Sequence, residues 1–349
     1  MAVPAQRDLE QACSQLADWL APRLGEGLSI AEIQMPGGTG FSSETLLFDA
    51  VLPGGEVRGL VAKVEPTGYR VFLDTNFEAQ FRVIEALARH TDVPVPPPYW
   101  YEPDKTVLGA PFYVLGKVEG QVPQDNPNYS SEGWLKELPP AEQEQVWWSG
   151  LEAMARVHAT DWKAAGLSFL DNPHRGQPGL DQQLHYYGEF LTWASGGDAS
   201  PLHRRALGWL DANRPTDEPL DLCWGDARIS NTIFDGTRAA ALLDWEMVTL
   251  GNGEQDLAWY IYLDWWFTEI VGNARLPGFP SREETAAHYE SLTGRTVRHL
   301  DYYDVFAAFR YCVIMTRLAE IMVSFDMWPA GEEFVGLTMT NQGLERVLP

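Results

Sequence analysis

The residues with the clearest chemical potential lie between positions 220 and 250. Asp226 and Asn231 stand five positions apart in the stretch WGDARISN, and Asp244 follows at the end of an apolar run. A carboxylate beside a hydroxyl can accept its proton, whereas an amide oxygen can ligate Mg²⁺ without adding charge. A second carboxylate can hold metal ions that bridge phosphate groups. The three residues therefore have the chemistry of a metal-assisted group-transfer site.

The D-x-x-x-x-N spacing also occurs in the catalytic loops of protein kinases, with a metal-binding Asp further along the chain. Taken alone, the spacing is also compatible with an Asx turn that caps a loop. Short apolar runs flank the motif and place Asp244 at the end of a strand, in the order that phosphoryl transfer needs. We therefore predict that Asp226 is the base and that Asn231 and Asp244 are magnesium ligands.

Two positively charged residues, Arg228 and Lys63, can take part in the same phosphoryl-transfer chemistry. Arg228 follows Asp226 by two positions, so its guanidinium can face a transferring phosphoryl group, although a structural salt bridge to a nearby acid is the alternative. Lys63 lies within LVAKVEP between apolar neighbours, an unfavourable place for an ammonium unless it points at an anion. We assign Lys63 to the α- and β-phosphates of a nucleotide, and a solvent-facing lysine is the alternative.

A glycine-rich turn precedes the lysine strand. In GGTGFSSE, the backbone near Gly40 and the hydroxyls of Ser42 or Ser43 can cover the phosphates of a nucleotide. A plain hairpin turn explains the pattern equally well, because it matches neither G-x-G-x-x-G nor a P-loop. The position of this turn before the Lys63 strand favours the phosphate-covering interpretation.

The elements that must position these residues change in character once along the chain. Apolar spacing predicts helices over residues 8–24 and 76–90, and short alternating runs predict an antiparallel meander between them and a strand within residues 110–120. After residue 120 the periodicity is mostly helical, apart from small strands at 220–250. We predict an α+β fold with a β-rich lobe over residues 1–119 and a helical lobe over residues 120–349.

Composition excludes several classes of protein. The chain has 349 residues, a formal charge of −24 and three cysteines. Such an acidic chain lacks the basic footprint of a general nucleic-acid binder. We expect no membrane segment and no metal cluster of the Cys/His type. Three widely separated cysteines favour a reducing cytoplasm.

These motifs resemble the aminoglycoside phosphotransferase-like kinases, also called phosphotransferase enzymes. The resemblance spans nearly the whole chain and rests on GFSSETLLFD, FYVLGKVEG, ARVHATDW, WGDARISN, LLDWEM and GNGEQDLAW. The last three look like the branch that includes kinase-like regions fused to acyl-CoA dehydrogenases. The resemblance implies a two-lobed kinase-like fold that binds ATP and Mg²⁺ in the cleft.

The resemblance also implies roles for single positions. It assigns the adenine-binding hinge to the backbone of four consecutive residues, Leu115, Gly116, Lys117 and Val118. His158 and Asp256 match positions that brace the catalytic loop. Two positions depart from the family pattern: Trp224 replaces a loop-supporting His, and Gln80 stands where an acid would pair with Lys63. Glu78 lies two residues away from that position, so we do not assign an ion-pair partner for Lys63 on that helix.

The sequence does not decide which molecule accepts the phosphoryl group. The family name and the acidic charge favour an aminoglycoside-like cation, whereas the fused branch favours a hydroxyacyl-CoA or a similar metabolite. A nucleotide-binding regulatory protein without turnover is the third possibility, motivated by Trp224 and Gln80.

In the helical lobe we expect most aromatic residues in the core, Asp264 facing solvent, and His174, His185 and His203 at the surface or in caps. The oligomeric state and the choice between ATP and GTP are not predicted.

Overall fold

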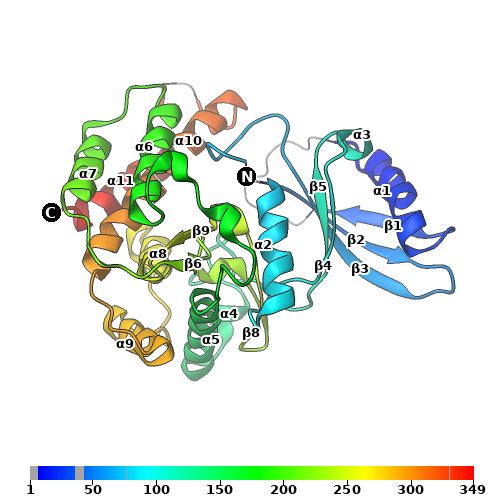
Figure 1. The fold of residues 1–349 in the computed structure, drawn as a ribbon, viewed down its shortest axis with the longest axis horizontal. Helices are drawn as coiled ribbons and strands as arrows, with labels where there is room; N and C mark the ends of the chain where they lie inside the picture. The colour runs from blue at the N-terminus through cyan, green and yellow to red at the C-terminus, as the bar shows by residue number, and fades with distance from the viewer. Residues whose placement is uncertain (1–6, 36–42, 76, 330) are drawn as a thin grey trace.

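The computed structural model describes residues 7–35, 43–75, 77–329 and 331–349. A sheet with two helices along it forms one end of the molecule, and a larger helical part forms the other (Figure 1). The α+β architecture agrees with the prediction. Gly40 and Ser42 lie outside the described residues, so only Ser43 of the predicted phosphate-covering turn is described.

The sheet has five strands in the order β1-β2-β3-β5-β4, and every neighbouring pair is antiparallel. The strands are β1 (Ser29–Gln34), β2 (Glu44–Val51), β3 (Val57–Val64), β4 (Pro98–Glu102) and β5 (Phe112–Gly116). Strands β2 and β3 form a hairpin in which Lys63 pairs with Thr45. On its other side Lys63 pairs with Tyr113 of β5, which places the lysine in the middle of the sheet.

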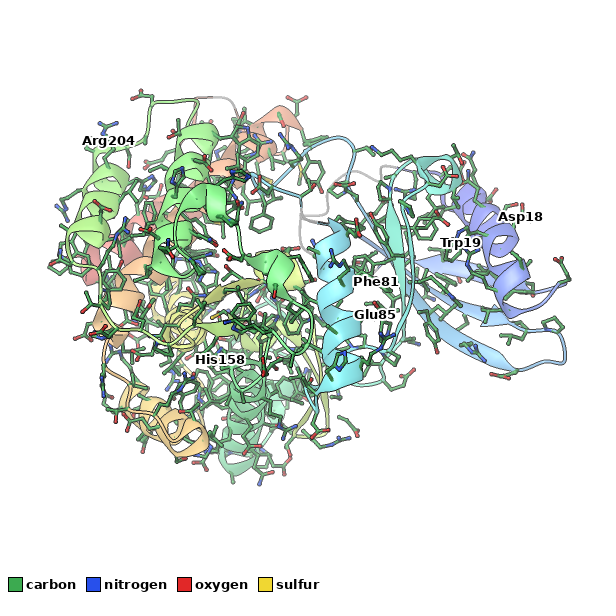
Figure 2. All side chains as sticks on the ribbon, viewed as in Figure 1. Asp18, Trp19, Phe81, Glu85, His158 and Arg204 are labelled. Carbon is green, nitrogen blue, oxygen red and sulfur yellow. The ribbon has the colours of Figure 1, made fainter. Side chains whose placement is uncertain are left out.

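Alternation along the strands gives the sheet two faces. Leu60, Ala62 and Val64 are fully buried and share a hydrophobic cluster with α1 (Leu9–Leu24). Helix α1 begins at Asp8, whose carboxylate accepts hydrogen bonds from the first turn. In Figure 2 Trp19 points toward the sheet and Asp18 points away from it. Lys63 therefore belongs to the opposite face.

The opposite face is covered by α2 (Phe77–His90). Phe77 packs on Tyr113 with ring centroids 5.0 Å apart, and Phe81 lies 5.9 Å from the same ring. Both rings belong to a hydrophobic cluster that continues into the helical part. The core is therefore continuous between the two ends of the molecule on the face that carries Lys63.

The helical part is organised around one long helix, α10 (Leu300–Ser324). It packs against four neighbouring helices: α6 (Leu180–Ala194), α7 (Pro201–Ala212), α8 (Glu254–Trp265) and α11 (Val335–Val347). Helices α5 (Pro140–His158) and α9 (Arg282–Thr293) pack against each other, and short helices α3 (Lys105–Leu108) and α4 (Trp134–Glu137) lie in connections. Helix α8 continues as a π-helical turn at Trp266–Ile270.

Two small ribbons interrupt the helices. Strands β6 (Asp221–Cys223) and β9 (Thr249–Gly251) form one, and β7 (Thr232–Asp235) and β8 (Arg238–Leu242) form the other. Gln121 forms a bridge with Phe234, which joins the segment after β5 to the second ribbon. The residues between these strands carry the predicted chemistry. Within the described ranges no helix has the length and apolar composition to cross a bilayer.

Candidate active site

The loop that carries Asp226 makes a sharp turn after β6. Gly225 has φ +92°, and a Cβ atom there would lie 2.0 Å from the carbonyl oxygen of Met247. Only glycine fits such a contact in the left-handed region. Residues Ile229–Asn231 then form one turn of 3₁₀ helix before β7 begins. The loop backbone is thus fixed by packing against the segment after Asp244.

Three side chains donate hydrogen bonds to the Asp226 carboxylate. Nε1 of Trp259 lies 2.9 Å from Oδ1, and Nδ2 of Asn231 lies 2.6 Å from Oδ2. Nε of Arg228 is 3.2 Å from Oδ2. The Asp226 side chain retains 12% of its exposure. The carboxylate is therefore held in one orientation and can still be reached by a small molecule.

Hydrogen bonds bring Asn231 and Asp244 to the same place. The N–H of Leu243, the residue before Asp244, donates to the Asn231 carbonyl at 2.8 Å. Nε1 of Trp224 donates to the Leu243 carbonyl at 2.7 Å. The Asn231 amide nitrogen is committed to Asp226, so its oxygen is the end that can ligate a cation. An amide oxygen and a carboxylate suit Mg²⁺.

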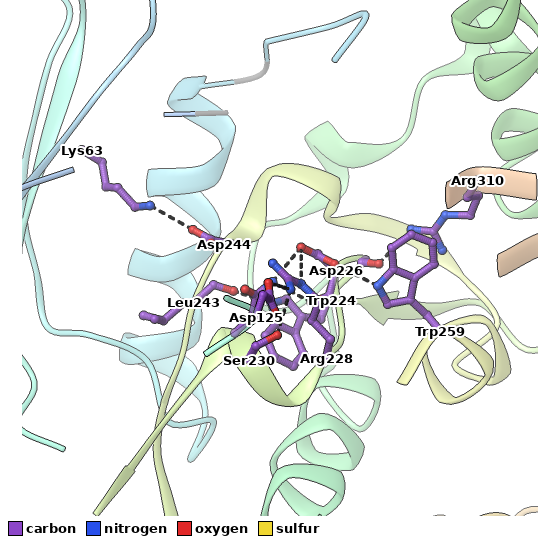
Figure 3. Close-up of polar contacts among 12 residues, drawn as sticks. Lys63, Asp125, Trp224, Asp226, Arg228, Ser230, Leu243, Asp244, Trp259 and Arg310 are labelled. Carbon is purple, nitrogen blue, oxygen red and sulfur yellow. Dashed lines mark hydrogen bonds and ion pairs between the residues drawn. The ribbon is translucent and has the colours of Figure 1, made fainter. Parts of the chain in front are cut away.

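Lys63 reaches across from the sheet to this group. Its Nζ lies 2.9 Å from Oδ1 of Asp244 and 3.1 Å from Oγ of Ser43 (Figure 3). Burial opposes both charges, but their attraction prevails: the pKa of Lys63 is raised and the pKa of Asp244 is lowered. Asp244 adopts φ +53°, in the left-handed region, which residues other than glycine enter infrequently. The structure therefore brings together all four residues that the sequence singled out.

The helix next to Lys63 offers it no acid at the expected position. Gln80 of α2 accepts a hydrogen bond from the Tyr113 hydroxyl at 3.1 Å, and both groups are buried. The Lys63 ammonium instead donates hydrogen bonds to Asp244 and Ser43. The ion-pair partner of Lys63 is thus Asp244, which lies outside this helix.

Arg228 is placed as the salt-bridge alternative describes. Its Nη1 contacts Asp125 and donates to Oγ of Ser230 at 2.8 Å, while its Nε contacts Asp226. Burial disfavours the charge, but Asp125 and Asp226 together raise the guanidinium pKa well above its usual value. Arg228 thus joins two carboxylates through one guanidinium. Its expected contact with a phosphoryl group stays a prediction.

A buried network braces the loop from behind. Nε2 of His158 lies 3.0 Å from Asp256, whose carboxylate accepts the backbone N–H of Trp224 at 2.6 Å and that of Gly225 at 3.0 Å. The bracing role expected of His158 and Asp256 is confirmed. The family pattern has a loop-supporting His where this chain has Trp224. Trp224 supports the loop instead, because its indole N–H donates to the Leu243 carbonyl.

The same network brings ligand-type atoms together. Atoms of His158, Asp256 and Cys223 lie within 4.8 Å of one another, although no Cys/His cluster was expected. Nδ1 of His158 is paired with the Tyr289 hydroxyl at 2.7 Å, so both ring nitrogens are already used. This arrangement supports the loop through hydrogen bonds.

The predicted hinge covers the last two residues of β5 and the two residues after it. The N–H of Gly116 donates to the Pro97 carbonyl at 2.7 Å, and that of Lys117 donates to the Gly59 carbonyl at 3.0 Å. These two N–H groups are therefore used within the sheet. The adenine-binding role of Leu115, Gly116, Lys117 and Val118 stays a prediction.

Two expectations for the helical part were wrong. Asp264 is 4% exposed and accepts hydrogen bonds from Tyr129 at 2.7 Å and Arg275 at 2.5 Å, so it does not face solvent. A charged residue in an aromatic helix suggested a solvent-facing carboxylate or one that faces the acceptor pocket, but Tyr129 and Arg275 cover it. His203 is 2% exposed and bonds Asn341 of the unpredicted helix α11. His174 and His185 are exposed as expected.

Sequence reasoning missed the partners that come from distant elements. Trp259 was assigned to the core, and it is buried, but its indole also bonds Asp226. Asp125 lies 103 positions from Arg228, and Arg310 of α10 bonds the Gly225 carbonyl. No spacing rule links these positions to the D-x-x-x-x-N motif.

Comparison with known proteins gives a consistent picture. Residues 40–293 match the phosphotransferase enzyme family. A probable acyl-CoA dehydrogenase of Arabidopsis thaliana is 27% identical over 327 residues, which cover 88% of this chain and 38% of that protein. Acyl-CoA dehydrogenase family member 11 of Gallus gallus is 31% identical over 273 residues, or 72% of this chain and 33% of its own length. The chain thus spans little more than a third of these relatives.

Solved structures share the fold. A candidate aminoglycoside phosphotransferase from Ralstonia eutropha superposes with a TM-score of 0.70 at 24% identity, covering 96% of this chain and 97% of the other. Aminoglycoside phosphotransferase APH(4)-Ia in complex with AMP-PNP and hygromycin B gives 0.56 at 17%, with 95% and 97% covered. Plasmodium vivax ethanolamine kinase gives 0.59 at 11%, with 95% and 84% covered. At these identities the likeness concerns the fold.

Proposed function

The chain belongs to the phosphotransferase enzyme family, and on that premise we propose that it transfers the γ-phosphoryl group of ATP, with Mg²⁺, to a hydroxyl of a small molecule. The observation that carries the proposal is the contact between Lys63 and Asp244 at 2.9 Å. It joins the sheet to the loop segment that also holds Asp226 and Asn231. Unpaired cysteines suit the proposed cytoplasmic location.

Each residue has a role that its surroundings support. Asp226 accepts the proton of the acceptor hydroxyl, because its carboxylate is oriented by Trp259 and Asn231. Asn231 and Asp244 supply the oxygens that would hold Mg²⁺, and Lys63 supplies the charge for phosphate. When bound, the metal neutralises phosphate charge. Catalysis by this chain is then positioning and electrostatics.

The first candidate acceptor is an aminoglycoside-like cation. Such a polyamine needs several unpaired carboxylates near the base. Asp125 is the further carboxylate that contacts the Asp226–Arg228 pair, and the Arg228 guanidinium already neutralises it. The acidic net charge of the chain still supports this candidate through long-range attraction.

A second candidate, a hydroxyacyl-CoA or a similar anionic metabolite, is favoured by a pair of arginines. The loop after β3 brings the carbonyl of Arg70 to Nε of Arg317 at 2.8 Å. Both guanidiniums lie over the ring of Trp193, at 5.5 and 4.4 Å from its centroid. Arg317 is already paired with Glu320, so of these two cations it is Arg70 that supports a phosphate-bearing ligand.

The test compares acceptors directly. Purified protein with Mg²⁺ and ATP is offered hygromycin B, ethanolamine or 3-hydroxybutyryl-CoA, and the phosphorylated product is sought by mass spectrometry. The Asp226→Ala variant is the control, since it keeps the nucleotide-binding residues. Product with one acceptor, lost in the variant, supports the proposal and names the acceptor class. Equal and negligible ATP turnover in both proteins would instead favour a regulatory nucleotide-binding protein.

A further inference from the structure

Arg310 is a buried cation that forms no ion pair. It lies in the middle of α10, is 1% exposed, and takes part in none of the salt bridges among the described residues. Its Nη2 donates to the Gly225 carbonyl at 2.8 Å, and its Nε donates to the Tyr187 hydroxyl at 3.1 Å. Its Nη1 is buried without a partner. A cation in this position is costly unless something nearby balances its charge.

Aromatic rings supply part of that balance. The guanidinium carbon lies 4.5 Å from the ring centroid of Trp259 and 5.4 Å from the rings of Tyr187 and Phe306. The faces of aromatic rings attract cations, but less strongly than a carboxylate at hydrogen-bond distance. The remaining balance must come from negative charges that Arg310 does not touch. Asp226 and Asp256 are the carboxylates whose charge, with that of Arg310, acts on the Tyr187 hydroxyl.

The peptide units around Gly225 connect these charges. The N–H of Gly225 donates to Asp256 at 3.0 Å, and its carbonyl accepts from Arg310 at 2.8 Å. Trp259, under the Arg310 guanidinium, donates its indole hydrogen to Asp226 at 2.9 Å. Figure 3 shows Arg310, Trp259 and Asp226 in this order. The residue before the base is therefore held between a carboxylate and a guanidinium.

We propose that Arg310 is a positioning residue of the phosphotransfer reaction, which acts through Gly225 and Trp259 to hold the Asp226 carboxylate toward the acceptor hydroxyl. This inference rests on the proposed function. The positive charge behind the loop also offsets Asp226 and Asp256 in a strongly acidic protein. Arg310 is buried and bonds Gly225 and Tyr187, so its loss should affect the chemical step and leave nucleotide binding in place.

The test measures Mg²⁺-dependent ATP hydrolysis and the Kd for AMP-PNP. We expect Arg310→Met to lower kcat by about 100-fold, the scale of a small displacement of a catalytic group, with the Kd changed by less than about threefold. Arg310→Lys restores the charge and should recover about tenfold of the loss. Arg275→Met is the matched control: Arg275 also lies near aromatic rings, 5.1 Å from Trp147, but it is paired with Asp264.

Unchanged kcat in folded Arg310→Met, or a kcat loss of the same size in Arg275→Met, would overturn the proposal. If Arg310→Met does not fold, Arg310→Lys decides: a lower kcat with an unchanged Kd supports positioning, and an unchanged kcat overturns it.

A second measurement needs no turnover. If Arg310 and Asp256 balance each other, the loss of Tm in the Arg310→Met/Asp256→Asn double variant is smaller than the sum of the two single losses. Additive losses of Tm would contradict the proposal that Arg310 and Asp256 balance each other's charge. Absence of turnover in the wild-type protein would sink the proposed function, whereas the Tm comparison would still report on Arg310.

Discussion

The indole nitrogen of Trp259 donates a hydrogen bond to Oδ1 of Asp226 at 2.9 Å, from the middle of a buried helix. Removing a donor from a buried carboxylate costs about 1.5–3 kcal/mol, which corresponds to roughly a tenfold to hundredfold change in rate. We expect Trp259→Phe to lower kcat for ATP hydrolysis by that factor with little change in KM. Trp265→Phe, whose indole bonds the surface residue Glu269, should keep the wild-type kcat.

The pair of Lys63 and Asp244 leads to a prediction about nucleotide affinity. Lys63→Met removes the ammonium from a site built for phosphate and leaves Asp244 without its cation. We expect the Kd for Mg²⁺ and AMP-PNP, measured by titration calorimetry, to rise by about 10–100-fold, the scale of a lost charge-assisted contact. Lys105→Met on the short helix α3 is the control. An unchanged Kd would contradict the phosphate role of Lys63.

The two roles considered for Arg228 differ in what happens when Asp125 is removed. A phosphoryl contact predicts that Arg228→Ala lowers kcat by about 100-fold or more, because a fixed cation stabilises the charge that develops in transfer. Asp125→Ala frees the guanidinium and should then cost less than about tenfold. Equal losses in the two variants would mean that the ion pair itself is what matters. Steady-state kinetics of ATP hydrolysis separates these outcomes.

The turn at Gly225 allows no side chain. Gly225→Ala would place a methyl group 2.0 Å from the Met247 carbonyl oxygen in a left-handed conformation. The backbone penalty alone is about 1–2 kcal/mol, and the clash adds to it. We expect a loss of several degrees in Tm and of nearly all turnover per folded molecule. Gly236→Ala, in the open turn between β7 and β8, has a positive φ without a clash and should lose stability only.

Asp304 gives a prediction about pH. Burial raises its pKa to about 6, although Arg282 opposes the shift. Because the folded state binds the proton more tightly than the unfolded chain, the contribution of this group is full below about pH 4 and is lost as pH rises through 6. Asp304→Asn removes that dependence. Relative to wild type, the variant should gain about 2 kcal/mol of unfolding free energy between pH 4 and pH 7, measured by urea denaturation.

The local parts of the fold could be predicted from the sequence because they depend on local patterns. Alternation in VRGLVAKVE gave β3 and the inward position of Lys63, and helical period gave α1, α2 and α10 within a few residues. The last helix, α11, was not predicted. Asn231 and the strand-terminal Asp244 were predicted from their spacing together with the apolar runs that flank them, and hydrogen bonds through Leu243 connect the two segments.

What could not be predicted depends on contacts between distant segments. Asp264 is a carboxylate on a helix that is buried along its length, and its partners Tyr129 and Arg275 come from other segments. Arg310 has no motif around it, and its partner Gly225 lies 85 positions away. Such residues are placed by the packing of α10 against its neighbours, which a single sequence does not encode locally.

The ion pair between Lys63 and Asp244 affects how the site would bind a metal ion and a nucleotide. If Asp244 holds Mg²⁺ as proposed, the Lys63 ammonium would no longer be the counter-ion of this carboxylate and would be available to the phosphates of a nucleotide. Gln80 of α2 is bonded to Tyr113 and not to Lys63, so a displacement of α2 would not break the contact between Lys63 and Asp244. In the proposed phosphotransferase, one carboxylate would therefore have Lys63 as its partner in the empty site and the metal as its partner in the loaded site.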